Sequence, residues 1–255
     1  MPLSLTDWHE RFSLQARWTR ELRRYLYRKA GIEKANRILE VGSGTGALFP
    51  DFKDLGAAQI YALDLNISFL EASRQMDQRV ILVQGDGHHL PFPSRTFDVC
   101  LCHFFLLWVD NPARVVGEMR RITRQGGSVF AFAEPDYSAR IDYPEELAVF
   151  GFWQKDSLSK QGADPSLGRR LAKLFVDNQI RINEVGVLGG SWDIAGRIEE
   201  YPSEIEIIQH DLGYLSLDED DRRSLDHLFV IDLESRKSGS RILFVPTFYA
   251  WGQVD

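Results

Sequence analysis

The chain has 255 residues, of which 44% are hydrophobic and 26% are charged, and its formal net charge is −7. This balance is typical of a globular protein with one large α/β domain and additions, and the acidic net charge argues against a general nucleic-acid-binding protein. We expect no membrane span, because no run of 18 apolar residues occurs, and no signal peptide, because the first residues lack a basic start and an apolar core.

Two cysteines, Cys100 and Cys102, lie together in one apolar run. They exclude a disulfide framework, are interpreted as small core residues, and favour a cytoplasmic location. A Cys-x-Cys pair without further cysteines is not a zinc site, so we expect no metal.

The first predicted element is a helix over residues 8–30, where apolar residues recur at helical spacing up to a terminating Gly31. The segment RILEVG, residues 37–42, predicts the first strand. A second helix is expected over residues 47–55, ended by Gly56.

Three more strands are predicted over residues 59–65, 80–86 and 97–105, and Asn66 is expected to cap a helix over residues 67–76. A further helix begins after Asn111, with Pro112 at its first position and Gly126 as its end, and a fifth strand covers residues 128–135. Strands that alternate with helices predict a mostly parallel sheet with helices on both faces.

The second half of the chain predicts two helices within residues 150–179, two final strands over residues 181–190 and 241–254, and acidic helices over residues 193–238 that form part of a lid. The segment EPDYSARIDYP follows the fifth strand. Its side chains either face a ligand at the carboxyl edge of the sheet or cap and pack an inserted helix; they are Glu134, Asp136, Tyr137 and Tyr143.

Three glycines follow the first strand in the segment RILEVGSGTG, at positions 42, 44 and 46. Glycine is unfavourable inside regular elements, so three of them in five positions need a geometric reason. In parallel sheets, ligands bind beyond the carboxyl ends of the strands, and helix N-termini favour anionic groups. The loop therefore predicts a ligand that approaches the backbone.

The glycine pattern leaves two classes of ligand open. Gly42, Gly44 and Ala47 satisfy the dinucleotide fingerprint, and Asp64 lies near the spacing of a ribose-binding acid, so an NAD(P)-dependent oxidoreductase is one interpretation. Against it stand an acid inside the first strand, Glu40, a second acid, Asp86, after the third strand, and a long helical segment before the first strand.

Three segments resemble, in order and spacing, the successive motifs of class I S-adenosylmethionine-dependent methyltransferases. They are ILEVGSGTG, YALDLN and GDGHHLPFPSRTFDVCLCHFFLLWVDNP. The likeness covers residues 35–135 and is closest to the small-molecule group that includes the ubiquinone and menaquinone C-methyltransferases. It implies a Rossmann-like, seven-stranded, mostly parallel sheet with helices on both faces, an antiparallel final strand, a helical N-terminal cap and insertions.

The resemblance also implies a role for each motif residue. The loop Gly42–Gly46 would pass beneath the methionine part of the cofactor, whose amino-acid end Glu40 would help to hold. Asp64 would accept hydrogen bonds from the ribose hydroxyls, and Asp86 from the adenine amine. His103 would lie near the sulfonium and is the leading candidate for a catalytic base. The full cofactor-binding set is Glu40, Gly42, Ser43, Gly44, Gly46, Asp64, Leu65, Asp86, Gly87 and His103.

The basic helix over residues 8–30 is predicted to be a mobile lid, more ordered when ligand is bound. Gln15, Trp18 or Tyr25 would then touch the cofactor or the substrate. The alternative is a helix that is packed permanently on the sheet.

Together these observations predict a single methyltransferase domain over residues 1–255. Its parts are a helical cap at 1–35, a cofactor-binding core at 36–135, helical insertions at 136–180 and 191–238, and the last strands at 182–190 and 241–254. The predicted reaction is direct methyl transfer from S-adenosylmethionine to a small-molecule acceptor, with S-adenosylhomocysteine as product. The alternatives are an NAD(P)-dependent oxidoreductase and a catalytically silent methyltransferase-like binding module. The sequence predicts neither the acceptor nor the oligomeric state.

Overall fold

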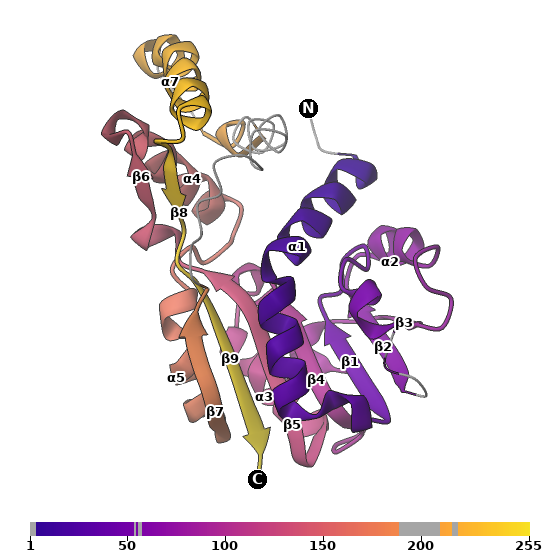
Figure 1. Ribbon diagram of the computed structural model, residues 1–255. Helices are drawn as coiled ribbons and strands as arrows, with labels where there is room; N and C mark the ends of the chain where they lie inside the picture. Colours follow the sequence, from indigo (N-terminus) through magenta and orange to yellow (C-terminus); the bar gives the residue numbers. More distant parts are fainter. Residues whose placement is uncertain (1–3, 54, 56–57, 189–209, 216–218) are drawn as a thin grey trace.

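A seven-stranded sheet in the order β3-β2-β1-β4-β5-β9-β7 organises the computed structural model (Figure 1), which describes residues 4–53, 55, 58–188, 210–215 and 219–255. The strands β1 to β5 run parallel to one another, whereas β9 is antiparallel to both β5 and β7. The expected Rossmann-like sheet with an antiparallel final strand is therefore confirmed. The strands are β1 (Arg37–Val41), β2 (Gln59–Asp64), β3 (Ile81–Gln84), β4 (Phe97–His103), β5 (Thr123–Pro135), β7 (Ile180–Val187) and β9 (Thr247–Val254).

The predicted helix ends agree with the structure at three places. Helix α1 (Leu5–Ala30) ends at Gly31, which adopts the left-handed conformation at φ +68°. The side chain of Asn66 caps α2 (Ile67–Ser73), and that of Asn111 caps α3 (Pro112–Ile122). Helix α3 is shorter than predicted, because β5 begins at Thr123 and the left-handed Gly126 lies inside that strand segment.

Two sequence-based predictions are wrong, and a proline explains each of them. Residues 47–55 do not form one helix but turns and a short 3-10 helix, Phe49–Phe52, because Pro50 cannot continue an α-helical hydrogen-bond ladder. The segment 241–254 is not one strand but two, β8 (Ile242–Phe244) and β9, since Pro246 between them has no N–H group to donate. Gly56, the predicted helix end, lies outside the described residues.

Alternating side chains on β4 show how the core is divided. Cys100 and Cys102 are buried among residues of α3 and of α5 (Leu171–Asp177) on one face, whereas Val99 and Leu101 pack with α1 on the other. The two cysteines are thus small core residues, as predicted. Each apolar side chain of this kind contributes roughly 1.5–3 kcal/mol to stability when it is fully buried. The two layers hold the sheet rigid, with its carboxyl edge free.

A second layer of structure lies beyond that edge and is called here the accessory lobe. It consists of β6 (Ile141–Tyr143) and β8, which pair as an antiparallel two-stranded sheet, with α4 (Ala148–Lys160) and α7 (Glu219–Lys237). Figure 1 shows the lobe on the side of α1 opposite to α2. The predicted pair of helices within 150–179 is confirmed as α4 and α5. Of the predicted acidic helices over 193–238, α7 is described, whereas residues 189–209 and 216–218 lie outside the described part.

Candidate active site

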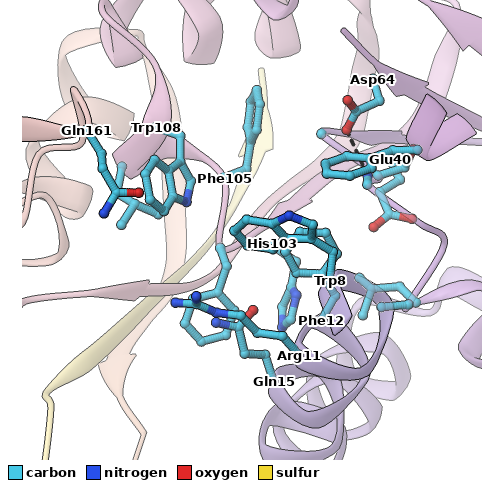
Figure 2. A pocket seen from close by; sticks show the side chains of 18 of the residues that line it. Trp8, Arg11, Phe12, Gln15, Glu40, Asp64, His103, Phe105, Trp108 and Gln161 are labelled. Carbon is cyan, nitrogen blue, oxygen red and sulfur yellow. Dashed lines mark hydrogen bonds between the residues drawn. The ribbon is translucent and has the colours of Figure 1, made fainter. Parts of the chain in front are cut away.

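A cavity of about 390 Å³ opens at the carboxyl ends of β1, β2 and β4, beneath the N-terminal half of α1. In Figure 2, Glu40 and Asp64 lie on one side of this cavity, and Trp108 and Gln161 lie on the other. The lining residues are Trp8, Arg11, Phe12, Gln15, Glu40, Gly42, Ser43, Gly44, Ala47, Leu48, Asp64, Phe69, His103, Phe104, Phe105, Leu107, Trp108, Tyr137 and Gln161.

Each glycine of the loop after β1 has a left-handed backbone and faces a phenylalanine ring. A Cβ atom at Gly42 would overlap the ring of Phe105, and one at Gly46 would lie 2.8 Å from that of Phe49. At Gly44 the nearest ring atom, of Phe12, would lie 3.1 Å away. The glycines thus satisfy both a backbone conformation and close internal packing. Gly42 and Gly44 also line the cavity, whereas Gly46 does not.

Two buried oxygen atoms beside this loop have no hydrogen-bond partner in the described structure. They are Oε2 of Glu40 and Oγ of Ser43, whose residues are 2% and 4% exposed and line the cavity. Burial raises the pKa of Glu40 well above its usual value, and the nearby Arg23 guanidinium opposes that shift. Since buried polar groups are nearly always paired, the two oxygens mark a place for a ligand that donates hydrogen bonds.

The carboxylate of Asp64 closes β2 next to the glycine loop. It accepts hydrogen bonds from the backbone N–H groups of Gly44 and Asn66, each at 2.8 Å. Burial raises the pKa of Asp64, and these two bonds oppose the shift. The side chain therefore fixes the loop and still offers lone pairs to the cavity.

His103 ends β4 and is held by a chain of polar side chains from α1. Its Nε2 lies 2.8 Å from the hydroxyl of Thr19, which accepts a hydrogen bond from the buried Arg23, and Arg23 in turn pairs with Asp51 at 2.6 Å. The Thr19 hydroxyl can also donate to the backbone carbonyl oxygens of Gln15 and Ala16, at 3.2 and 3.3 Å, so its contact with Nε2 fits either tautomer of the ring. Burial, with Arg23 beside it, lowers the pKa of His103 well below its usual value. The ring is neutral and a weak base.

The residues expected around the adenine occupy the rim rather than the cavity. Leu65 is 70% exposed, and Gly87 packs against the ring of Phe105. Asp86 caps the short turn that follows β3: it accepts from the backbone and from the ring of His88, at 2.9 and 2.7 Å. These bonds lower the pKa of Asp86. The geometry at Asp86 is that of a strand-end cap, with its side chain half exposed.

Of the four residues expected to face an acceptor after β5, only Tyr137 lines the cavity. Glu134 instead accepts hydrogen bonds from three backbone N–H groups of residues 105–107, at 2.9 to 3.2 Å. Asp136 is 1% exposed and pairs with Arg169, and Tyr143 lies on β6 with half of its surface in solvent. These three side chains therefore match the other possibility predicted from the sequence, in which they cap and pack an inserted helix and do not face a ligand.

The N-terminal helix presents a different face to the cavity from the one predicted. Gln15 lines the cavity, but Trp18 is 49% exposed and does not, and Tyr25 reaches across to Glu184 on β7. The lining positions recur at 8, 11, 12 and 15, which is the spacing of one helical face. This periodicity was available in the sequence, yet the rotation of the helix about its axis comes from its packing. The residues missed on this face are Trp8, Arg11 and Phe12.

Aromatic rings connect the N-terminal half of α1 with its surroundings above the cavity. Trp8 and Phe12 contact Phe69 of α2, at ring-centroid distances of 6.4 and 5.8 Å. Trp8 also contacts His210, at 5.9 Å. The cavity is thus roofed by α1 between α2 and the segment around His210.

The comparisons with known proteins agree with this geometry. Residues 39–131 match the family described as a methyltransferase domain. Among curated proteins, the demethylmenaquinone methyltransferase of Renibacterium salmoninarum is 31% identical over 132 residues, which are 51% of this chain and 55% of that protein. The phosphatidylethanolamine N-methyltransferase of Cereibacter sphaeroides is 34% identical over 102 residues, or 38% and 49% of the two chains. The chain therefore spans about half the length of the curated relatives it matches.

Solved structures share the fold at low sequence identity. A candidate methyltransferase from Bacillus halodurans superposes with a TM-score of 0.58 at 15% identity, covering 85% of this chain and 91% of the other. The [4+2]-cyclase SpnF superposes with a TM-score of 0.56 at 16% identity, over 91% and 80% of the two chains.

Residues 39–131 thus resemble a methyltransferase domain, and the sheet around them has the Rossmann-like architecture that the solved structures share. The predicted resemblance to class I S-adenosylmethionine-dependent methyltransferases is confirmed, including its likeness to the quinone group. The similarity to a cyclase shows that the fold alone does not define the reaction, so the activity is argued from the site.

Proposed function

We propose that this chain is an enzyme that transfers the methyl group of S-adenosylmethionine to a small-molecule acceptor. The observation that carries the proposal is the pair of unpartnered buried oxygens, Glu40 Oε2 and Ser43 Oγ, beside the glycine loop of a methyltransferase domain. A buried carboxylate in such a place is suited to an ammonium group, because charge-assisted hydrogen bonds are the stronger kind. The amino-acid end of S-adenosylmethionine carries that group.

The remaining cofactor contacts follow the order of the strand ends. Asp64 would accept hydrogen bonds from the ribose hydroxyls while it holds the backbone of Gly44 in place. Leu65, exposed at the rim, offers an apolar surface for the adenine ring, and the turn that Asp86 caps would lie at its far edge. The bound cofactor supplies an electrophilic methyl group; the protein supplies position and electrostatics.

The rest of the cavity would hold the acceptor and exclude water. Trp108 lies opposite Glu40 and Asp64 (Figure 2), and Phe105 and Leu107 add further apolar lining. A dry, rigid wall of this kind aligns two reactants and removes competing solvent. The neutral His103 adds no positive charge beside the sulfonium, and its low pKa does not suit the role of a strong base.

Calorimetry with S-adenosylhomocysteine and with NAD tests the cofactor assignment. Binding of S-adenosylhomocysteine, with no heat from NAD, is the expected result, and the reverse would support the NAD(P)-dependent oxidoreductase. Turnover of a panel of phenols, quinols and amines, followed by release of S-adenosylhomocysteine, separates an enzyme from a catalytically silent binding module.

The proposed setting of the enzyme is the cytoplasm. Cys100 and Cys102 are free and fully buried, which suits a reducing compartment. No helix in the described part of the chain is long and apolar enough to cross a membrane. The net charge of −7 supports a small-molecule acceptor over a nucleic acid.

A further inference from the structure

Of the described residues that line the cavity, Arg11 is the one with a cationic side chain. It lies on the inner face of α1, between Trp8 and Gln15, and is partly buried. Its guanidinium carbon lies 5.4 Å from the ring centroid of Trp8, a cation–π contact, and no hydrogen bond to its N–H donors is seen among the described residues. Within the described residues, no carboxylate lies within ion-pair distance of this guanidinium.

Three acidic side chains in or near this part of the molecule have other described neighbours. Asp211, which is 3% exposed, accepts a hydrogen bond from Gln154 at 3.2 Å. At the other end of the cavity, Asp64 holds the glycine loop and Glu40 lies near Arg23. Among the described residues, Arg11 is thus a cation without an ion-pair partner in a largely apolar cavity, and such a charge is costly unless a ligand pairs with it.

Two further hydrogen-bond donors lie near Arg11. The amide of Gln15 is one helical turn away on the same face, and the hydroxyl of Tyr137 lines the same cavity. The positive charge of Arg11 acts on Tyr137 closely enough to oppose the rise in pKa that burial causes there. No described hydrogen bond uses the Tyr137 hydroxyl or the Gln15 amide. Three free donors therefore share one end of a cavity with aromatic walls.

We propose that Arg11 binds an anionic oxygen group of the methyl acceptor, so that the substrate class is a small aromatic or apolar acid. A guanidinium presents paired N–H donors that match the two oxygens of a carboxylate, and the donors of Gln15 and Tyr137 complete the site. The apolar body of the acid packs against the aromatic wall. This inference rests on the proposed function, because it assigns one end of the cavity to the acceptor.

Matched pairs of acids and primary amides test the charge preference directly. Protein saturated with S-adenosylhomocysteine is titrated calorimetrically with benzoate and benzamide, 3-hydroxy-2-naphthoate and 3-hydroxy-2-naphthamide, and 4-phenylbutanoate and 4-phenylbutanamide. We expect at least one acid to bind tenfold or more tightly than its amide. If no acid binds more tightly than its amide, the proposal is overturned.

Variants of Arg11 test whether this residue causes the preference for an acid over its amide. Arg11→Met should abolish the difference between acid and amide, and Arg11→Lys should retain part of it. The control is Arg17→Met, an exposed arginine on the same helix, which should behave like the unchanged protein. A preference that persists in Arg11→Met would overturn the proposal.

The cofactor's own carboxylate is the competing partner for Arg11. If it binds there, Arg11→Met will weaken the binding of S-adenosylhomocysteine about tenfold or more, and that result overturns the proposal; unchanged affinity supports it.

The same pairs of acids and amides are also titrated into the protein without S-adenosylhomocysteine. If that ligand fails to bind the unchanged protein, the proposed function fails, whereas an acid preference that depends on Arg11 would still stand.

Discussion

Glu40 and Glu134 are both buried carboxylates at the carboxyl edge of the sheet, but their surroundings give them opposite roles. Glu134 is surrounded by donors, since three consecutive backbone N–H groups point to its oxygens. Glu40 keeps one oxygen without a partner, directed to a cavity. The first stabilises the turn after β4, and the second remains available for a ligand.

Replacement of Glu40 tests whether its carboxyl group binds the ligand. We expect Glu40→Gln to weaken S-adenosylhomocysteine by ~1.5–3 kcal/mol, the usual contribution of a hydrogen bond to a charged group. Without ligand the variant should be at least as stable as the unchanged protein, because burial already disfavours the charged form of Glu40 and glutamine carries no charge. Calorimetry and urea unfolding measure the two effects, with the exposed Glu33→Gln as control. Unaltered affinity for S-adenosylhomocysteine would remove Glu40 from the cofactor site.

The raised pKa of Glu134 predicts that the free energy of unfolding depends on pH. Burial raises the pKa of Glu134 to about 7, above its ordinary value of 4.5, although its three hydrogen bonds oppose the shift. Between these values the folded state binds more protons than the unfolded state, so stability falls as pH rises from about 4.5 to 7 and is level above that. The slope is at most ~1.4 kcal/mol per pH unit.

Urea unfolding of the unchanged protein and of Glu134→Gln between pH 4.5 and 8 isolates this contribution. Other titrating groups affect both proteins equally, so the difference in unfolding free energy should decline by about 2–3 kcal/mol up to pH 7. A difference that is constant with pH would show that Glu134 does not titrate in this range.

At the scale of elements, the two halves of α1 are held differently. Leu26 and Tyr27 in the C-terminal half are buried in the core against strands of the sheet. The N-terminal half is held by Trp8 and Phe12, which make ring contacts over the cavity, and Phe12 covers Gly44. A ligand that reaches Gly44 must displace or contact Phe12, so this half is the part of the helix suited to move.

Hydrogen exchange with and without S-adenosylhomocysteine tests the lid. We expect ligand to slow exchange in residues 5–15, which cover the cavity with Trp8 and Phe12, and to leave residues 22–30 unchanged because they are already in the core. A Trp18→Ala variant should retain ligand affinity, since Trp18 faces solvent. Strong, equal protection of residues 5–15 in both states would mean a permanently packed helix.

At the scale of the whole molecule, buried ion pairs join distant segments into the accessory lobe. Asp232 on α7 pairs with Arg236 at 2.9 Å and with Arg241 at 2.5 Å. Arg241 also pairs with Asp142 of β6, which pairs in turn with Arg140, both at 2.7 Å. These charges are almost fully buried, so the loss of one leaves its partners unpaired in a low dielectric. Helix α4 of the lobe ends directly before Gln161 of the cavity lining, so the lobe helps to shape that end of the cavity.

Removal of the central carboxylate should loosen this lobe. Asp232→Asn is expected to destabilise the protein by roughly 3–5 kcal/mol, the cost of breaking a buried ion pair. Glu234→Gln, whose exposed carboxylate pairs only with Lys237, should change stability by less than about 1 kcal/mol. Urea unfolding and limited proteolysis of residues 219–244 compare the two. Equal stability of both variants would show that the cluster does not hold the lobe.

Much of the fold was predictable because its signals are local. Asn66, Asn111 and Gly31 cap helices within a few residues of themselves, and each prediction agrees with the structure. The two wrong elements also had a local signal that was overlooked, namely Pro50 and Pro246. The same locality placed Glu40, the glycine loop and Asp64 at one edge, because the carboxyl ends of parallel strands meet there.

The sequence by itself determined the succession of strands and helices along residues 37–135, the edge at which the motif residues gather and the family that the core resembles. Only the tertiary structure decided which of those residues face the cavity. Glu134 is bound by amides some thirty positions earlier in the chain, and Trp18 faces solvent because Leu26 and Tyr27 fix the rotation of α1. Caps and turns depend on neighbours in sequence, whereas the direction of a side chain depends on contacts between distant segments, which no local pattern contains.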